Sequence, residues 1–364
     1  MPPTLKGLSP SERLSPRSAL RMWRPEDRRD AFSVLVVVVL LHLVAFGLLI
    51  GVVAPLHDQV GGVIGVGLGL TSYTYGLRHA FDADHIAAID NTTRKLRGDG
   101  RRSTSVGFWF AMGHSTIVAV LAALVAGGTQ LAAALTDGSS STEQALRLVS
   151  TTLSGTFLFL IAGLNLVALG RLARMFGKAR RGELAGPEME AGLAGGGIVT
   201  TILGRLNRTV SRPWQMYLVG MLFGLGFDTA TEVSLLVLAG SGAAQRLPWA
   251  AIMALPILFA AGMSLLDSID GLFMSVAYEW AFLNPTRKIY YNLSITGLSV
   301  LVAVVIGSIE LVDVLHDHAG WRSPISDWIS GLRISDAGFV IAGLFVVTWA
   351  VAVTWWRLLR VEAR

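Results

Sequence analysis

The chain has 364 residues, of which 52% are hydrophobic and only 15% are charged. A typical soluble domain carries about 25% charged residues, so this deficit and the long apolar runs exclude an ordinary soluble protein and indicate a polytopic membrane protein. The chain has no cysteine, which excludes disulfides, thiolate metal sites and cysteine nucleophiles.

The sequence predicts an all-α polytopic membrane protein with eight transmembrane helices. Residues 1–31 are polar and show no cleavable signal pattern, so a disordered cytoplasmic tail is expected. The transmembrane domain is expected at 32–358 and includes a cytoplasmic loop at 172–213. Its spans, each with the roughly 20 mainly apolar residues that cross the hydrocarbon, are predicted at about 32–54, 61–89, 105–127, 149–171, 214–240, 249–277, 289–310 and 337–357.

Two of these spans contain residues that weaken a helix. Gly113 and His114 are expected to interrupt the third span, and Pro256 and Gly262 the sixth. Interrupted helices are tolerated in a membrane where they line a cavity. Both spans are therefore expected to border one.

The distribution of basic residues predicts the orientation of the chain in the membrane. Of the 30 Lys and Arg residues, 25 fall in the N-terminal tail, the C-terminus and one alternating set of loops. The opposite loops hold only four. Because Lys and Arg accumulate on the cytoplasmic side, both termini are predicted to be cytoplasmic. The formal net charge of +5 therefore reflects membrane topology, and no nucleic-acid partner is expected.

The most polar stretch lies at the end of the second span. Residues Arg78–Ile86 read RHAFDADHI and contain His79, Asp82, Asp84 and His85. At about 100° per residue, a regular helix places His79, Asp82 and His85 on one stripe and Asp84 away from it. Either Asp84 has a different role or the helix is distorted at this point.

Further ionisable residues lie on three other spans: His114 on the third, Asp228 and Glu232 on the fifth, and Asp267 and Asp270 on the sixth. Unpaired acidic residues are costly at membrane depth, at about 2.5–3.5 kcal/mol each on the insertion scale. Imidazole and carboxylate groups without thiolates suit a divalent first-row metal. Together the four clusters predict an ion pathway.

For several single residues, a structural role is the alternative to a role in the ion pathway. An intramembrane histidine such as His114 is, taken alone, as often a buried hydrogen-bonding group as a ligand. His42, Asp90 and Asn165 are expected to be structural. His57, His316 and His318 are predicted in outer loops, as solvated side chains or as collectors of metal ions.

The second and fifth spans also share a pattern. GLRHAFDADH and GLGFDTATE have GL, FD and A in common. Three spans separate the two segments, so they would cross the membrane in opposite directions. This indicates an inverted repeat with a site at its interface.

Four motifs resemble those of the NiCoT family of nickel/cobalt permeases. They lie in the family's order at Arg78–Ile86, Phe110–Val118, Leu225–Glu232 and Gly262–Asp270. The resemblance covers roughly residues 35–310 and implies uptake of Ni²⁺ and/or Co²⁺ across the cytoplasmic membrane. It also implies that His79, Asp84 and His85 are central.

The expected function is therefore that of a secondary transporter and not an enzyme. An ATP-driven mechanism is not expected, since no GxxxxGK[ST] nucleotide-binding motif is present. A metal exporter of related fold and, less favoured, a membrane di-iron oxidase are the alternatives. The expected partners are the metal ion, as cargo and not as cofactor, and the bilayer; a cytoplasmic metallochaperone is left open. The predicted metal-site residues are His79, Asp82, Asp84, His85, His114, Asp228, Glu232, Asp267 and Asp270.

Overall fold

A computed structural model of the chain describes residues 23–56, 66–126, 210–225, 248–282, 285–318 and 320–330, with shorter pieces inside 148–181 and 340–354. These residues form helices, turns and loops, and contain no β-strand. The all-helical architecture predicted from the sequence is confirmed for this part of the chain. Much of the tail, the 172–213 loop and the fifth span lies outside it, so their boundaries stay predictions.

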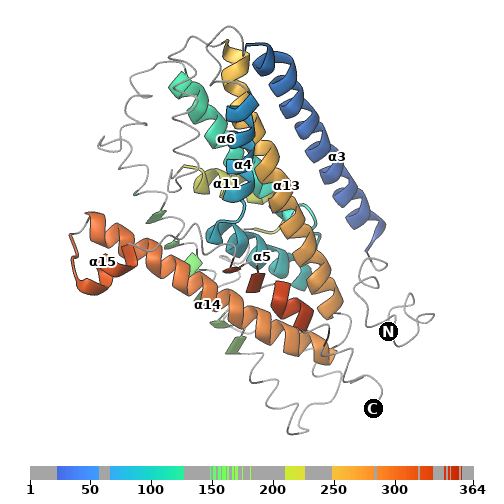
Figure 1. Ribbon diagram of the computed structural model, residues 1–364. Helices are drawn as coiled ribbons and strands as arrows, with labels where there is room; N and C mark the ends of the chain where they lie inside the picture. Colours follow the sequence, from blue (N-terminus) through green and yellow to red (C-terminus); the bar gives the residue numbers. More distant parts are fainter. Residues whose placement is uncertain are drawn as a thin grey trace.

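The longer helices form a bundle (Figure 1). Helix α3 continues into a π-helical turn at Leu49–Val53 and a 3₁₀ turn at Ala54–Leu56, and a 3₁₀ turn at Pro213–Gln215 precedes α11. The α-helices are α3 (Pro25–Leu48), α4 (Val66–His79), α5 (Ala83–Gly98), α6 (Val106–Ala126), α11 (Met216–Phe223), α13 (Trp249–Phe282), α14 (Pro285–His318) and α15 (Pro324–Ser330).

Three helical stretches of the described residues are long and apolar enough to cross a membrane. They cover Pro25–Val53, Val106–Ala126 and Trp249–Glu279. They coincide with the predicted first, third and sixth spans. Helix α3 also exposes large apolar side chains such as Phe32 and Leu43, which are 65% and 64% exposed. Such a surface suits lipid contact.

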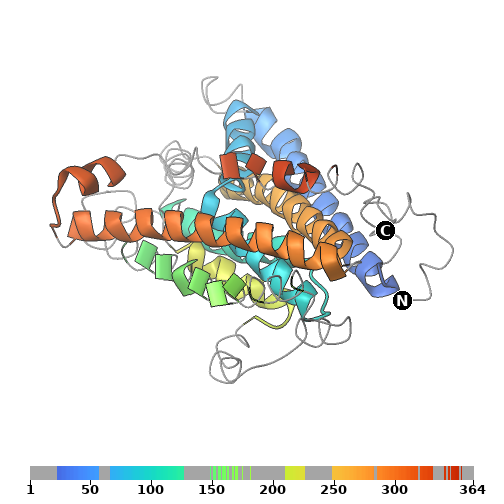
Figure 2. The same ribbon diagram turned by 90° about the horizontal axis from the view of Figure 1, so that it is seen from below.

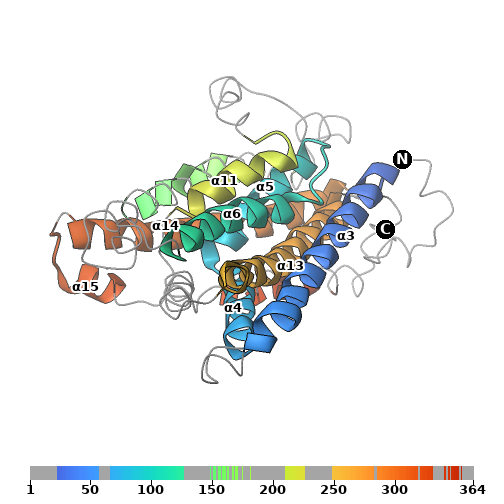
Figure 3. The same cartoon turned by 90° about the horizontal axis from the view of Figure 1, so that it is seen from above.

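Helix α13 is the centre of the bundle. It packs against α3, α4, α5 and α6, and Figure 3 shows it nearly end on between α6 and α3. Helix α14 crosses the lower part of the bundle, as Figures 1 and 2 both show. Because α13 packs against each of these helices, its side chains can meet side chains of several helices in one buried site.

Glycines bring α13 and α6 very close to their neighbours. A Cβ on Gly76 of α4 would overlap the backbone carbonyl of Phe259, and one on Gly107 of α6 would overlap that of Asp267. Small residues permit such backbone approach between membrane helices, where van der Waals packing drives association. These contacts set the spacing of α4, α6 and α13 around the residues discussed below.

Two sequence expectations about helix continuity are wrong. The second span is not one helix over 61–89, because α4 ends at His79 and α5 begins at Ala83. Asp82 occupies the N-cap position of α5 with φ −65° and ψ 142°, an extended conformation that a helix start permits and a helix interior does not. Conversely, α6 and α13 run unbroken through the positions expected to interrupt them, including Pro256.

Candidate metal site

Three histidines from three helices meet in the interior of the bundle. His79 ends α4, His85 lies in the first turn of α5, and His114 lies within α6. Each is only 1% exposed. One potential ligand atom from each ring lies within 4.8 Å of the other two, and the Nε2 atoms of His79 and His114 are 2.9 Å apart. We call these residues the histidine triad.

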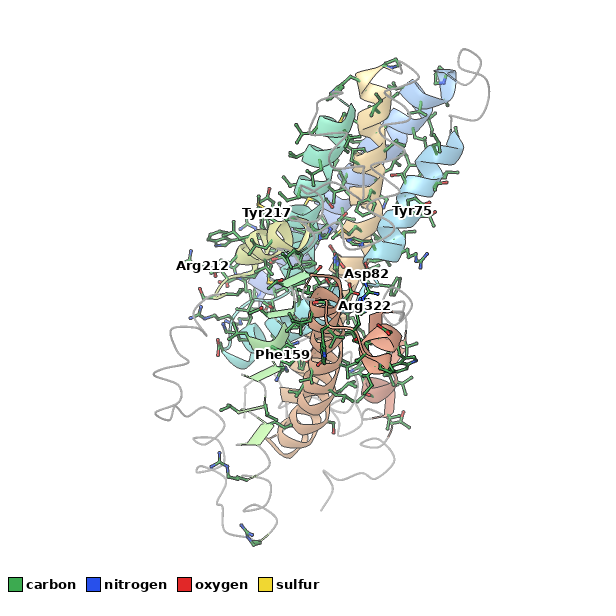
Figure 4. The ribbon with its side chains drawn as sticks, turned by 90° about the vertical axis from the view of Figure 1, so that its left-hand side faces the viewer. Tyr75, Asp82, Phe159, Arg212, Tyr217 and Arg322 are labelled. Atoms are coloured by element: carbon green, nitrogen blue, oxygen red, sulfur yellow. The ribbon has the colours of Figure 1, made fainter. Side chains whose placement is uncertain are left out.

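The break between α4 and α5 creates half of this arrangement. It turns the chain at Ala80–Asp82, so that His79 and His85 face each other with ring centroids 4.6 Å apart. His114 completes the triad at 4.6 Å from His79 and 4.9 Å from His85. In Figure 4, Asp82 marks the level of this turn, near the end of α4 and beside α13.

Two buried carboxylates flank the triad. Asp82 Oδ2 lies 2.8 Å from His79 Nδ1, and Asp267 Oδ2 of α13 lies 3.5 Å from His85 Nδ1. The two residues are 5% and 0% exposed. Carboxylates beside metal-binding imidazoles orient the rings and strengthen them as ligands. The site thus combines three neutral nitrogen donors with two acidic groups.

Several atoms at the site lack the hydrogen bonds that buried polar atoms normally make. Within the described part of the chain, neither ring nitrogen of His85 and neither carboxylate oxygen of Asp267 has a hydrogen-bond partner. The 3.5 Å between them is longer than an ordinary N–H···O bond. Because a neutral imidazole has a lone pair on one nitrogen, this arrangement fits a divalent cation.

Aromatic rings enclose the triad. The ring of Phe259 lies 5.5 Å from that of His79, and the ring of Phe110 lies 4.7 Å from that of His85. Both phenylalanines are completely buried. These walls limit access of water and lower the local dielectric constant, so charges at the site interact more strongly than in water. The sequence analysis placed Phe110 at the start of a motif but predicted neither ring as a wall of the site.

Comparison with known proteins gives the family. A family model described as high-affinity nickel-transport protein (NicO) matches residues 65–355. The chain belongs to this family.

Relatives of the chain match it over nearly their whole length. The nickel transporter NicT of Mycobacterium tuberculosis is 51% identical over 330 residues, covering 90% of this chain and 89% of that protein. The cobalt transport protein NhlF of Rhodococcus rhodochrous is 40% identical over 347 residues, covering 94% and 96%. The high-affinity nickel-transport protein NixA of Helicobacter pylori strain J99 is 41% identical over 293 residues, covering 79% and 87%. No solved structure matches the chain.

In this member of the family, Asp84 has a different place from Asp82. Its Oδ1 accepts a hydrogen bond of 2.9 Å from the backbone N–H of His85, in the first turn of α5. It also interacts electrostatically with Asp82 and His79. Asp84 therefore satisfies a backbone N–H in the first turn of α5, whose N-cap position is held by Asp82. Its role as a direct ligand stays a prediction.

The remaining predicted site residues lie away from the triad or outside the described residues. Asp270 is half-buried one turn beyond Asp267 and interacts electrostatically with Asp90. The hydroxyl of Tyr278 donates a hydrogen bond to Asp90, which supports the structural role expected for that residue. Asp228 and Glu232, like His57 and Asn165, lie outside the described residues.

Sequence reasoning missed a buried arginine at the end of α5. Arg97, counted as a loop residue, is in fact 6% exposed at the end of α5. Its Nη1 lies 3.1 Å from Glu279 Oε2 and 3.5 Å from Asp27 Oδ2. Its Nε and Nη2 donate to the Ser275 hydroxyl at 3.1 and 2.9 Å. Arg97 thus ties α5 to α3 and α13.

Two other histidines make local contacts. His42 contacts the Val38 carbonyl oxygen at 2.8 Å and the Tyr73 hydroxyl at 3.3 Å, which agrees with the packing role expected for it. His316 Nε2 lies 2.9 Å from Asp327 Oδ1, so α14 and α15 contact each other where an outer loop was predicted.

Proposed function

We propose that this chain is a secondary transporter that imports Ni²⁺ and/or Co²⁺ across the cytoplasmic membrane through the histidine triad. The observation that carries the proposal is the convergence of three buried imidazoles, with ligand atoms within 4.8 Å of one another. Relatives whose names are those of a nickel transporter and a cobalt transport protein support the choice of cargo.

The donor set accounts for the cargo class. Imidazole suits first-row metals such as nickel, whereas carboxylate and water alone suit Mg²⁺, Ca²⁺ or Mn²⁺. A dication that leaves water also needs compensating charge, because burying an uncompensated ion is costly. Asp82 and Asp267 supply that charge beside His79 and His85. The ion exchanges its hydration shell for these groups as it enters.

The broken second span suits a transport site. Discontinuous helices place their ends at the substrate in many secondary transporters. The end of α4 offers backbone carbonyl oxygens, which favour a cation. The start of α5 is positive and carries Asp82 and Asp84, whose charges offset it. The metal is cargo in this mechanism, and no resident cofactor takes part.

The topology in the membrane is part of the proposal. Eight spans with both termini in the cytoplasm account for the distribution of basic residues, and an inverted repeat would pair the second span with the fifth. Asp228, Glu232 and Asp270 then provide counter-charge along the pathway. The bilayer is the chain's environment, and delivery to a cytoplasmic metallochaperone is compatible with release inside.

Uptake of radioactive nickel by cells expressing the chain tests the proposal. Expression is expected to raise cellular nickel, whereas an exporter would lower it. His85→Ala removes a ligand and is expected to reduce uptake to background, with His42→Ala as the matched control. Wild-type uptake by His85→Ala at equal membrane abundance would disprove the role of the triad.

A further inference from the structure

One face of α13 passes the histidine triad and carries three residues four positions apart. Phe259 contacts the ring of His79, and Asp267 contacts His85. Residues at i, i+4 and i+8 share a helix face. Met263 lies midway between the other two on this face, and its side chain is completely buried. Met263 therefore lies on the face of α13 that contacts the triad, between a ring wall and a carboxylate.

A contact from α6 locates the sulfur atom more closely. The hydroxyl of Ser115, the residue after His114, donates to Met263 Sδ over 3.7 Å. Ser115 is itself 4% exposed. Met263 also packs in the same buried cluster as Phe110 and Phe259, the two ring walls of the triad. The sulfur of α13 thus contacts α6 at the residue that follows His114.

We propose that Met263 is a ligand of the transported ion and a determinant of its selectivity. The inference rests on the proposed transport function. A thioether sulfur has two lone pairs and is a weak hydrogen-bond acceptor, so the contact with Ser115 orients the sulfur and leaves a lone pair for a metal. Ser115 is then a positioning residue for that ligand.

The chemistry of sulfur explains how this ligand affects the choice of metal ion. Soft thioether donors favour soft and borderline metals, while hard cations such as Mg²⁺ and Mn²⁺ prefer oxygen. A sulfur among three imidazoles therefore strengthens binding of Ni²⁺ or Co²⁺ and adds little for Mn²⁺. Met263 widens the difference in affinity between the cargo and the hard cations.

The composition of the chain makes the test direct. The chain has no cysteine, so any sulfur bound to the metal comes from methionine. The full chain is purified in detergent and loaded with Ni²⁺, and its coordination shell is measured by nickel K-edge X-ray absorption. The variant is Met263→Leu, a nearly volume-conserving change. Met274→Leu is the matched control, because Met274 is a buried α13 methionine in a different cluster.

A sulfur neighbour is expected in the wild type and in Met274→Leu, and is expected to be lost in Met263→Leu. The variant's nickel affinity is expected to fall by about 10-fold or more, the size of effect seen when a partner of a metal ligand is removed. In uptake assays, inhibition by excess Mn²⁺ is expected to strengthen relative to the wild type.

The outcomes separate this inference from the proposed function. A shell of nitrogen and oxygen only in the nickel-loaded wild type overturns the role of Met263 and leaves transport standing. Sulfur that persists in Met263→Leu overturns it as well, since another methionine is then the ligand. A wild type that neither binds nor imports nickel overturns the proposed function itself.

Discussion

Replacing Asp267 with asparagine removes one negative charge from the site and changes almost nothing else. Asp267 is fully buried, and its Oδ2 lies 3.5 Å from His85 Nδ1. Two unit charges about 4 Å apart attract by about 4 kcal/mol at an effective dielectric constant of about 20. A dication doubles this gross attraction to about 8 kcal/mol.

The net loss is smaller than this gross attraction, because the wild-type carboxylate must be held out of water. Removing one partner of a buried charge pair costs about 2–5 kcal/mol. Asp267→Asn is therefore expected to weaken nickel binding by a factor on the order of 30 to 3,000. Without metal, the variant is expected to be at least as stable as the wild type, since it no longer buries an unpaired carboxylate.

Isothermal titration of the purified chain with Ni²⁺ measures the affinity, and thermal unfolding with and without nickel measures the coupled stability. A bound ion stabilises the folded state by about 2.7 kcal/mol at 100 times its Kd, and this gain is expected to shrink in the variant. Asp99→Asn is the control, because Asp99 is an exposed carboxylate at the C-terminal end of α5. Wild-type affinity in Asp267→Asn would refute the charge-compensation argument.

Two further predictions concern the bundle. Arg97→Met removes the Arg97 cation from buried Asp27 and half-buried Glu279, so thermal unfolding is expected to show a loss of about 3–5 kcal/mol, whereas exposed Arg102→Met should change little; equal effects would contradict the buried pairing. Gly107→Leu places a Cβ against a backbone carbonyl of α13 that cannot move aside, and is expected to abolish monodisperse protein in size-exclusion chromatography. Gly47→Leu, which meets open space, is the control, and a well-folded Gly107→Leu would argue against the close packing.

The parts of the fold that local sequence determines were predicted well. Helices α3, α6 and α13 overlap the predicted first, third and sixth spans, because apolarity over about 20 residues is a property of each segment alone. The concentration of histidine and aspartate at Arg78–Ile86 likewise indicated where buried ionisable side chains gather. Such groups are rare at membrane depth, and their presence there needs a cause.

Some contacts between distant segments were not predicted. Arg97 counted toward the cytoplasmic charge of a loop, yet it is buried against residues of α3 and α13. Phe110 and Phe259 looked like any apolar residues of a span, because only the crossing of α6, α4 and α13 brings them to the triad. Neither periodicity nor composition reports such crossings.

Residues on either side of the break between α4 and α5 favour a helix end and a helix start. The projection of the sequence onto one regular helix did not take these preferences into account. Arg78 and His79 form a basic last turn, and Asp84 lies in the first turn of the next helix. Basic residues favour helix C-termini and acidic residues favour N-termini. The stripe of His79, Asp82 and His85 was derived for a regular helix, with a distorted helix as the stated alternative, so the proximity of His79 to Asp82 was expected from a different geometry. A turn creates it.

The break also separates the two aspartates by role. A helix N-terminus carries about half a positive charge, which opposes a dication placed beside it. Asp84 accepts the backbone N–H of His85 at that end and so neutralises the start of α5, while Asp82 turns toward His79. One acidic residue lets the helix begin next to a cation site, and the other adds negative charge to the site. The sequence Asp-Ala-Asp-His therefore meets two electrostatic requirements that a continuous helix would not impose.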